Sequence, residues 1–254
     1  GSSTYTLPLV VPPGSGGVSP KLALAYDARA GWGAMGVGWQ LSGLSSISRC
    51  KKTIEAGDGA TRDAIVFDDD VSNKVFCLDG QRLLAQGVGL GACPVLESGI
   101  GQMFSLELDT VTRVCGYRAS GASGFDRWLV YGGDGSIRRY GVSGNSVLAP
   151  IDGDGAINPG HVLRYAMDRL MDANGHAIDF EYARNNALGE LNLLTVRYTG
   201  KGSLTNPFDT STSRAFFARM DFVYDNLPTT AQRLDYVAGA TIALRQRLLR
   251  IDVF

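Results

Sequence analysis

The sequence has no hydrophobic run long enough to cross a bilayer. Its two long uncharged stretches, Ser2–Pro20 and Ala30–Ser48, are interrupted by Gly, Pro and Ser, whereas a membrane-spanning helix needs about 20 consecutive, mostly apolar residues. The beginning also has no basic segment followed by an apolar one, which is the pattern of a secretory signal peptide. We therefore expect no membrane insertion by this domain and no signal peptide within the sequence.

Neither sign of charge is in excess. Lys and Arg total 24, Asp and Glu total 25, and the net charge is −1. Proteins that bind nucleic acids usually carry a basic patch or stripe, so the composition predicts no nucleic acid partner. The basic residues are mostly Arg, which suits fixed, bidentate or stacked contacts better than a diffuse positive surface.

Residues that bind metals and cofactors are scarce. The chain has two histidines, His161 and His176, and 4 cysteines that form no CxxC pair, so no zinc pattern is present. Asp152–Gly155 lacks the full spacing of a calcium loop, and Asp68–Asp70 is typical of a solvated turn. Gly14–Gly17 is not followed by the Lys-Ser/Thr pair of a phosphate loop. We expect no metal and no cofactor.

Motifs of nucleophilic catalysis are absent as well. No G-x-S-x-G elbow occurs. His176 follows Asn174-Gly175 and would be placed to act as a base with Asp172, but a polar residue at the end of a hairpin explains the same pattern. His161 stands beside a glycine in a predicted loop. The sequence therefore predicts no catalytic residue and no enzyme. A hydrolase, the weakest alternative, would need polar side chains that converge on one of the two histidines.

Glycine, in contrast, is abundant. The chain has 33 Gly and 9 Pro, and 44% of its residues are hydrophobic, which suits a packed globular domain. Short apolar segments alternate with turns rich in Gly, Asn and Asp, a pattern typical of antiparallel β-structure. The expected fold class is all-β, with antiparallel hairpins in a large curved sheet. No linker or charge block divides the chain, so we expect a single domain over residues 1–254.

Turn signals separate most of the predicted strands. Asp79-Gly80 predicts a tight turn, and the Asn-Gly of Asp172–Gly175 predicts a type I′ hairpin, in which both central residues have positive φ. Thr199–Ser213 is predicted to be a long loop, and Gly239 argues against a long helix in Thr229–Arg245. The predicted strands are Leu7–Val11, Leu22–Tyr26, Ala64–Phe67, Lys74–Leu78, Gln81–Leu84, Trp128–Tyr131, Ser136–Tyr140, Leu163–Met171, His176–Tyr182, Leu194–Tyr198, Arg219–Tyr224 and Arg247–Phe254.

Two residue types are candidates for special roles. Trp32 and Trp39 stand among glycines in Gly31–Gly43, where the backbone can approach aromatic faces closely. Packing against the sheet is the favoured role, and carbohydrate binding stays open. Three pairings of the cysteines are possible. Two structural disulfides and four buried thiols are both compatible with their positions, which are Cys50, Cys77, Cys93 and Cys115.

The first fifty residues carry a longer pattern, in the blocks Tyr5–Gly14, Ser19–Tyr26 and Gly36–Cys50. These blocks resemble the opening of the N-terminal domain of the Salmonella virulence plasmid protein B family. The same domain begins the B component of insecticidal Tc toxin complexes and many large Rhs/YD-repeat proteins. Phe76–Leu83 resembles the next block of the Rhs-associated members, and Asp168–Tyr182 resembles the family's Asn-Gly hairpin with its aromatic strand. The resemblance covers the first two thirds of the chain.

This resemblance implies a structural role. In Tc-type proteins the domain forms part of a hollow β-shell together with the YD repeats, and the shell encloses a cytotoxic C-terminal segment. The chain would then be a fragment of a larger, secreted or cell-surface Rhs/YD-repeat protein. Its partners would be the YD-repeat shell and C-terminal toxin of its own polypeptide, and other toxin-complex subunits. In the Salmonella family the ADP-ribosyltransferase is a separate entity, and no E-x-E pair typical of such enzymes occurs here.

The resemblance also bears on the cysteines and on the end of the chain. Family members with the Ser-Arg-Cys ending of the first block tend to carry the Phe76–Leu83 block, which favours Cys50 with Cys77 and leaves Cys93 with Cys115. The chain ends on the strand-like run Arg247–Phe254. We expect this strand to pair, in the parent protein, with sequence that is absent here.

A different class of function remains as the alternative. A surface adhesive or carbohydrate-binding β module would use the segment that contains Trp32 and Trp39. That module predicts an exposed aromatic cluster with affinity for glycans. A shell panel predicts instead no defined pocket and sheet edges that are left open.

Overall fold

The computed structural model describes residues 1–52, 65–67, 75–86, 93–96, 99–122, 124–150 and 158–254. Within these residues the chain is antiparallel β-structure with short 3₁₀ turns and no α-helix, which confirms the all-β fold class. The strands are β1 (Thr4–Pro8), β2 (Ala23–Asp27), β3 (Trp32–Gly33), β4 (Gly36–Val37), β5 (Trp39–Ser42), β6 (Ser46–Arg49), β7 (Phe76–Leu78), β8 (Gln81–Ala85), β9 (Gly99–Leu106), β10 (Arg113–Ala119), β11 (Arg127–Tyr131), β12 (Ile137–Tyr140), β13 (Val147–Leu148), β14 (Arg164–Met171), β15 (His176–Asn185), β16 (Glu190–Lys201), β17 (Ala218–Asn226), β18 (Arg233–Val237), β19 (Ala240–Leu244) and β20 (Gln246–Val253). The 3₁₀ turns are η1 (Ser15–Gly17), η3 (Gly144–Ser146), η4 (Pro159–His161) and η5 (Asn186–Leu188).

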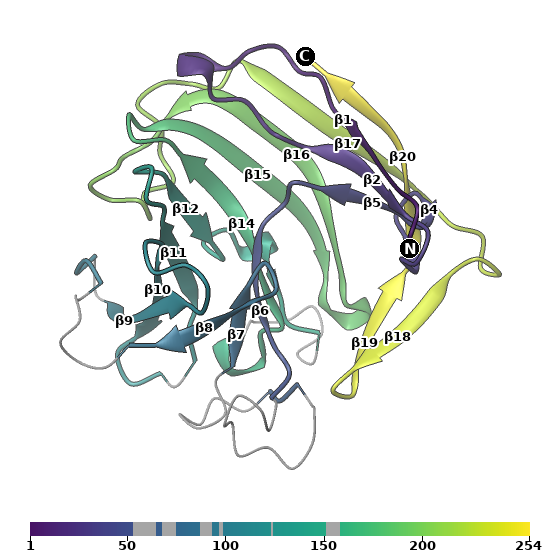
Figure 1. Cartoon of the computed structure of the whole chain (residues 1–254), viewed down its shortest axis with the longest axis horizontal. Helices are drawn as coiled ribbons and strands as arrows, with labels where there is room; N and C mark the ends of the chain where they lie inside the picture. The colour runs from purple at the N-terminus through teal and green to yellow at the C-terminus, as the bar shows by residue number, and fades with distance from the viewer. Residues whose placement is uncertain (53–64, 68–74, 87–92, 97–98, 123, 151–157) are drawn as a thin grey trace.

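The largest sheet closes on itself at one end (Figure 1). Strands β6 to β12 are neighbours in chain order, β12 pairs with β14, and β14 pairs with β6. These strands therefore form a β-barrel, which the sequence did not predict. A closed ring has no free edge strand, so each of its strands has a neighbour on both sides.

Aromatic side chains fill the inside of the barrel. Trp128 is fully buried, and its ring centroid lies 4.6 Å from that of Phe125, 5.0 Å from Phe76 and 5.4 Å from Phe104. Gly116 belongs to this packing, because a Cβ atom there would lie 2.7 Å from Trp128 and 2.8 Å from Phe125. A barrel of about eight strands has an interior that side chains can fill, and here large rings occupy it.

Residues on the barrel wall alternate between two apolar clusters. Val114 and Trp128 belong to the main core, whereas their neighbours Cys115 and Leu129 belong to a second cluster that also contains Phe208. Successive side chains of a strand point to opposite faces. The wall between β9 and β12 is thus covered on both sides, which explains why β11 has three consecutive buried residues.

The sheet forks at β14 and continues as an open sheet. The first part of β14 pairs with β6, and its last residues pair with β15. From there the order is β15-β16-β17-β20, and β20 ends the sheet. Figure 1 shows the long strands of this part as a curved layer beside the barrel.

A second, smaller sheet lies over the open part. It has the order β1-β2-β5, and Figure 1 shows these strands in front of β15 to β17. Leu22, in the connection between β1 and β2, is buried in one cluster with Ile178 and Val196 of the open sheet. Leu41 of β5 packs against that cluster. Two isolated hairpins, β3–β4 and β18–β19, complete the described structure.

The turns agree only in part with the prediction. Asp79 and Gly80 have φ values of 49° and 84°, as a two-residue type I′ turn requires. The Asp172–Gly175 hairpin is present, but the type I′ prediction is wrong, because Gly175 alone among its residues has positive φ. Its turn is closed by the Gly175 N–H, which donates to the Asp172 carbonyl at 3.0 Å.

Three segments refine the predicted boundaries. β16 extends through Lys201, which pairs with His176, so the loop begins at residue 202 rather than at Thr199. The region around Gly239 forms the β18–β19 hairpin, with Ala238 and Gly239 at φ values of 49° and 85°. The predicted turn Asp68–Asp70 lies outside the described residues. The strand predicted at Ala64–Phe67 is wrong in its described part, because residues 65–67 are not in a strand, and the strand predicted at Lys74–Leu78 is β7, which begins at Phe76.

Candidate interaction sites

A buried group of charges lies where β12 pairs with β14. Arg139 and Arg169 face each other across the two strands, and a register shift leaves Asp168 as the extra residue of a β-bulge. Arg139 Nε donates to Asp168 Oδ1 at 2.7 Å. Arg169 holds both carboxylate oxygens of Asp179, at 2.5 and 2.7 Å. We call Arg139, Asp168, Arg169 and Asp179 the arginine clamp.

The arginine clamp holds the loop of residues 202–213 by its backbone. Arg139 Nη1 donates to the carbonyl of Asp209 at 3.1 Å, and Arg169 Nη1 donates to the same carbonyl at 2.8 Å. Arg169 Nη2 also donates to the Thr210 carbonyl at 3.1 Å. Phe208, in the same loop, is buried with its ring centroid 5.0 Å from that of Tyr117. The loop is therefore part of the packed structure.

Both acids of the clamp accept hydrogen bonds from other groups of this protein. Asp168 Oδ2 accepts from the backbone N–H groups of Val142 and Ser143, at 2.8 and 2.7 Å. Burial acts to lower the pKa of Arg169, but the hydrogen bonds and charge of Asp179 raise it above its ordinary value. Sequence reasoning missed this cluster. The available signal was the alternation of β12, which places Arg139 on the same face as the buried Ile137.

His176 and Asp172 come together, as the sequence allowed. His176 Nδ1 lies 2.8 Å from Asp172 Oδ2, and the His176 N–H donates to Asp172 Oδ1 at 2.8 Å. Burial acts to raise the pKa of Asp172, but hydrogen bonds from His176 and the Asn174 N–H lower it. Gly16 lies against the His176 ring, and the hydroxyl of the preceding Ser15 donates to the Thr199 carbonyl. His161 lies apart, in η4. The pair thus closes a hairpin, and among the described residues no Ser, Thr or Cys side chain is hydrogen-bonded to the histidine ring.

The cysteines lie in two pairs on the barrel side of the molecule. Cys50 is joined to Cys77 and Cys93 to Cys115, and the Cα atoms of each pair are 5.8 Å apart. The first pair links the end of β6 to β7. The second ties the segment before β9 to β10. Both pairs would stabilise the wall of the barrel.

The two tryptophans of the glycine-rich segment have different surroundings. Trp39 packs between Tyr26 and Tyr5, with ring centroids at 5.3 and 6.5 Å. Trp32 is 49% exposed, and the Arg233 guanidinium lies over its ring at 4.7 Å from the centroid. Among the described residues no ring contact joins the two tryptophans. They do not form one aromatic platform.

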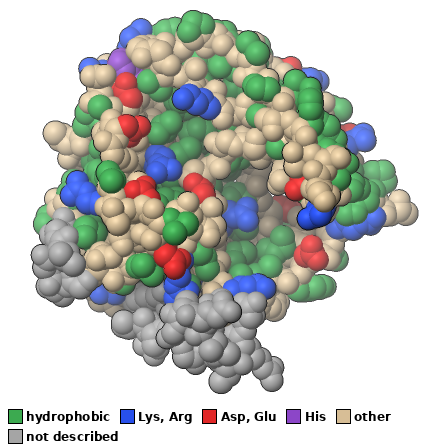
Figure 2. Space-filling model, viewed as in Figure 1, with side chains coloured by type: hydrophobic (Ala, Val, Ile, Leu, Met, Phe, Trp, Pro, Cys, Tyr) green, Lys and Arg blue, Asp and Glu red, His purple; other side chains and the backbone are tan. Residues whose placement is uncertain are grey.

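Trp32 borders a groove at the β18–β19 hairpin. The groove has a volume of about 520 Å³ and is also lined by Arg233, Leu234 and Asp235. Leu234 is exposed, and so is Tyr236 two residues further along β18. Figure 2 shows that the molecule is hollowed near the centre of one face, with Lys or Arg side chains among hydrophobic ones.

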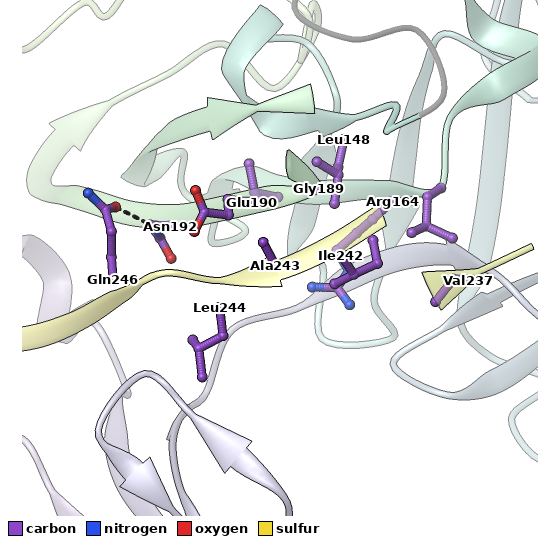
Figure 3. A pocket seen from close by; sticks show the side chains of 12 residues that line it. Leu148, Arg164, Gly189, Glu190, Asn192, Val237, Ile242, Ala243, Leu244 and Gln246 are labelled. Atoms are coloured by element: carbon purple, nitrogen blue, oxygen red, sulfur yellow. Dashed lines mark hydrogen bonds between the residues drawn. The ribbon is translucent and has the colours of Figure 1, made fainter. Parts of the chain in front are cut away.

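A second pocket adjoins the same hairpin and shares Ile242, Ala243 and Leu244 with the groove (Figure 3). It has a volume of about 210 Å³ and is bordered by β14, β19 and the start of β16. Glu190 Oε1 accepts from the Arg245 N–H at 3.0 Å, and Asn192 Nδ2 donates to Gln246 Oε1 at 2.9 Å. Burial raises the pKa of Glu190. The absence of a defined pocket, expected for a shell panel, is therefore not observed.

Two other features concern metals and membranes. Across the described ranges, no group of three or more His, Cys, Asp or Glu side chains is arranged to hold a metal ion. In the same ranges, no helix has the length and apolar character to cross a membrane. The calcium-loop candidate Asp152–Gly155 lies outside these ranges.

Comparison with known families gives one match over most of the chain. The model of the family described as Salmonella virulence plasmid 65kDa B protein matches residues 1–194. No curated protein matches the chain.

Solved structures are similar over the whole chain. The N-terminal domain of the effector protein SpvB from Salmonella typhimurium strain LT2 has a TM-score of 0.75 and 17% identity, covering 100% of this chain and 87% of that chain. The crystal structure of TcdB2-TccC3-Cdc42 has a TM-score of 0.75 and 18% identity, covering 100% of this chain and 13% of that chain. The Tc holotoxin pore of Photorhabdus luminescens has a TM-score of 0.75 and 14% identity, with the same coverage of 100% and 13%. At these identities the similarity shows the fold, and this chain spans a small part of the two Tc chains.

Proposed function

Since the chain belongs to the Salmonella virulence plasmid 65kDa B protein family, we propose that it is a non-enzymatic structural domain of a toxin protein. It forms part of the wall of a hollow β-shell that encapsulates a C-terminal toxin and helps to deliver it. The observation that carries this proposal is the open edge of the large sheet. A sheet that is closed into a barrel at one end and open at β20 can be extended in one direction only.

The open edge lies on β20. On one side β20 pairs with β17 from Met220 to Asn226. On its other side the Leu248 N–H donates to the Ala34 carbonyl at 2.7 Å, and no strand is paired there among the described residues. Leu249 and Val253 of β20 are exposed. An exposed apolar edge strand promotes aggregation unless another strand or segment covers it, and a further strand of the parent shell would cover it.

This role defines the partners that we propose. They are the YD-repeat shell and the C-terminal toxin of the same polypeptide, together with other toxin-complex subunits. Two of the similar structures are Tc assemblies, named TcdB2-TccC3-Cdc42 and Tc holotoxin pore, which supports such partners. The proposed location is outside the cell or at the bacterial surface, as is appropriate for a toxin protein.

Electron microscopy of the full-length parent protein tests the proposal. We expect a hollow particle with density inside and with this domain in the wall, where β20 pairs with a following strand. A solid, open or extended particle would contradict encapsulation. A hollow particle in which β20 faces solvent would keep the shell but refute the role of the edge.

The exposed Trp32 supports one alternative, a carbohydrate-binding module. A glycan would stack on the indole and bond to polar groups of the neighbouring groove, such as Arg233 and Asp235. A glycan array with the chain and its Trp32→Ala variant separates the two functions. Binding that Trp32→Ala abolishes would favour the alternative, and the shell proposal expects no such binding.

A further inference from the structure

The pocket in Figure 3 contains a cation that has no partner. Arg164 is the first residue of β14 and lines the pocket. Within the part of the chain that the structure describes, its guanidinium makes no hydrogen bond and no ion pair. Arg169 of the same strand differs from Arg164 in this respect, because it binds both carboxylate oxygens of Asp179. Arg164 is exposed at the start of the strand, so its guanidinium is accessible to a ligand from solvent.

The other polar groups of the pocket already have partners. Glu190 accepts from the backbone of Arg245, and Asn192 donates to Gln246. Figure 3 shows Glu190 and the Arg164 side chain on either side of Ala243 in that view. Arg164 therefore supplies the free hydrogen-bond donors, and a ligand that matches them has to be an acceptor.

The remaining walls are apolar. They are formed by Leu148, Leu163, Val237, Ile242 and Leu244. Leu148 and Leu163 are already buried by the protein, whereas Val237, Ile242 and Leu244 are partly exposed. A small inorganic anion would satisfy the guanidinium but would leave these three partly exposed side chains uncovered. An acidic residue with apolar neighbours in its own chain would satisfy both, since burial of apolar surface adds to the ionic contact.

We propose that this pocket binds an acidic peptide segment of a partner protein, with Arg164 as the donor to a Glu or Asp carboxylate. The guanidinium presents N–H groups in a planar fork that matches the two oxygens of a carboxylate. The apolar walls then contact the residues that flank the acidic one. The proposal concerns a peptide contact of this domain and does not depend on encapsulation.

A pair of peptides that differ in one group tests the contact. The probes are acetyl-Leu-Glu-Leu-amide and its Gln counterpart, titrated into the ¹⁵N-labelled 254-residue chain and followed by NMR. We expect the Glu peptide to bind at least about ten-fold more tightly, because a charge-assisted hydrogen bond is replaced by a neutral one. The shifted amides should include Gly189 and Ala243, which line the pocket.

Variants assign the effect to one residue. Arg164→Gln should remove the preference for the Glu peptide. Arg118→Gln, an arginine of β10 that lines none of the pockets described above, should keep it. If Arg164→Gln does not fold, Arg164→Lys serves instead and should retain only part of the preference, because it keeps the charge and loses the fork.

Several results would overturn the proposal. Equal binding of the two peptides would reject a carboxylate contact. So would the absence of binding by either peptide at a peptide concentration of about 10 mM, which is roughly the weakest dissociation constant of interest. Inorganic phosphate that binds as tightly as the Glu peptide would reject the role of the apolar walls. Self-association of the chain that Arg164→Gln abolishes would identify a second copy as the occupant, in place of a partner protein.

Discussion

The barrel and the open sheet of this molecule treat charge and edges in opposite ways. In the barrel, Arg139 and Asp168 form an ion pair whose side chains are 4% and 1% exposed. On the open sheet, the pairs Arg197–Glu181 and Arg247–Asp225 lie at the surface. The barrel has no free edge strand, whereas the open sheet ends at β20. Both disulfides lie on the barrel side.

This difference assigns the stability of the fold to the barrel and contact with other segments to the open sheet. Buried pairs and aromatic packing fix one part of the molecule, since loss of a partner there leaves an uncompensated buried group. Exposed ion pairs contribute little, and the part that carries them also carries the free edge. We infer that the barrel provides a stable base and that the open sheet provides the surface for other segments. The following predictions test that division.

The largest effect should come from the barrel interior. Trp128→Ala removes a fully buried ring that contacts Phe76, Phe104 and Phe125. It should lower the free energy of unfolding by about 3–5 kcal/mol. Urea unfolding followed by circular dichroism measures the loss. Trp32→Ala, at the surface, is the matched control, and similar losses in both variants would contradict the comparison.

The arginine clamp should come next. Arg139→Met leaves the Asp168 carboxylate buried without its cationic partner, which should cost about 3 kcal/mol. The value lies at the low end of the usual range because Asp168 keeps its bonds to Val142 and Ser143. Limited proteolysis should then cut the loop of residues 202–213. A loop that stays resistant would show that Arg169 alone holds it.

The disulfides should contribute somewhat less. Cys93→Ala with Cys115→Ala opens a link across 22 residues, and we expect a loss of about 2–3 kcal/mol. Thiol titration of the denatured, unreduced protein should find no free thiol. Four reactive thiols would refute both bonds and would favour the buried-thiol interpretation of the sequence.

Alkaline pH should weaken the barrel before it ionises the native tyrosines. Burial raises the pKa of Tyr140 from 10.0 to about 12. A folded-state pKa above the unfolded one means that this stability is complete below pH 10 and is lost as the pH rises toward 12. By pH 11 the loss from Tyr140 should be about 1 kcal/mol. Tyr140→Phe should flatten this part of the stability profile, and an unchanged profile would reject the assignment.

The smallest effect should come from the hairpin at the start of the open sheet. The pKa of Asp172 is lowered from 3.8, so its contribution is present above pH 3.8 and is lost as the pH falls through the folded-state value. Asp172→Asn should be slightly less stable than the wild type at pH 6 and should match it at pH 2. Stability curves at both values measure this difference. A deficit that persists at pH 2 would be due to packing rather than charge.

The local structure was predictable where short-range chemistry decides it. Asp79-Gly80 formed the expected turn, because both residues tolerate positive φ. The alternation of Ile178, Phe180 and Tyr182 correctly placed one buried face of β15. The β18–β19 hairpin was missed because Ala238, an uncommon residue at positive φ, occupies its turn. Local patterns also gave no sign that β12 and β14 would pair, since closure depends on contacts between distant segments.

The candidate sites were harder to predict for the same reason. His176 and Asp172 lie in one hairpin, so their contact follows from the turn between them. The arginine clamp joins three separate parts of the chain, and nothing in the spacing of Arg139 and Arg169 indicates that they share a loop carbonyl. Arg164 was missed because its property is the lack of a partner, which only packed coordinates reveal.

The fork at β14 also dictates an order of assembly. The β14–β15 hairpin joins residues that are close in sequence, whereas β6 must wait for β14, since Ile47 pairs with Tyr165. Closing such a long loop carries an entropic cost and slows folding. During synthesis from the N-terminus, β6 therefore emerges long before its neighbour exists. The part of the molecule with no free edge when finished is the part whose edge stays unpaired longest on the ribosome.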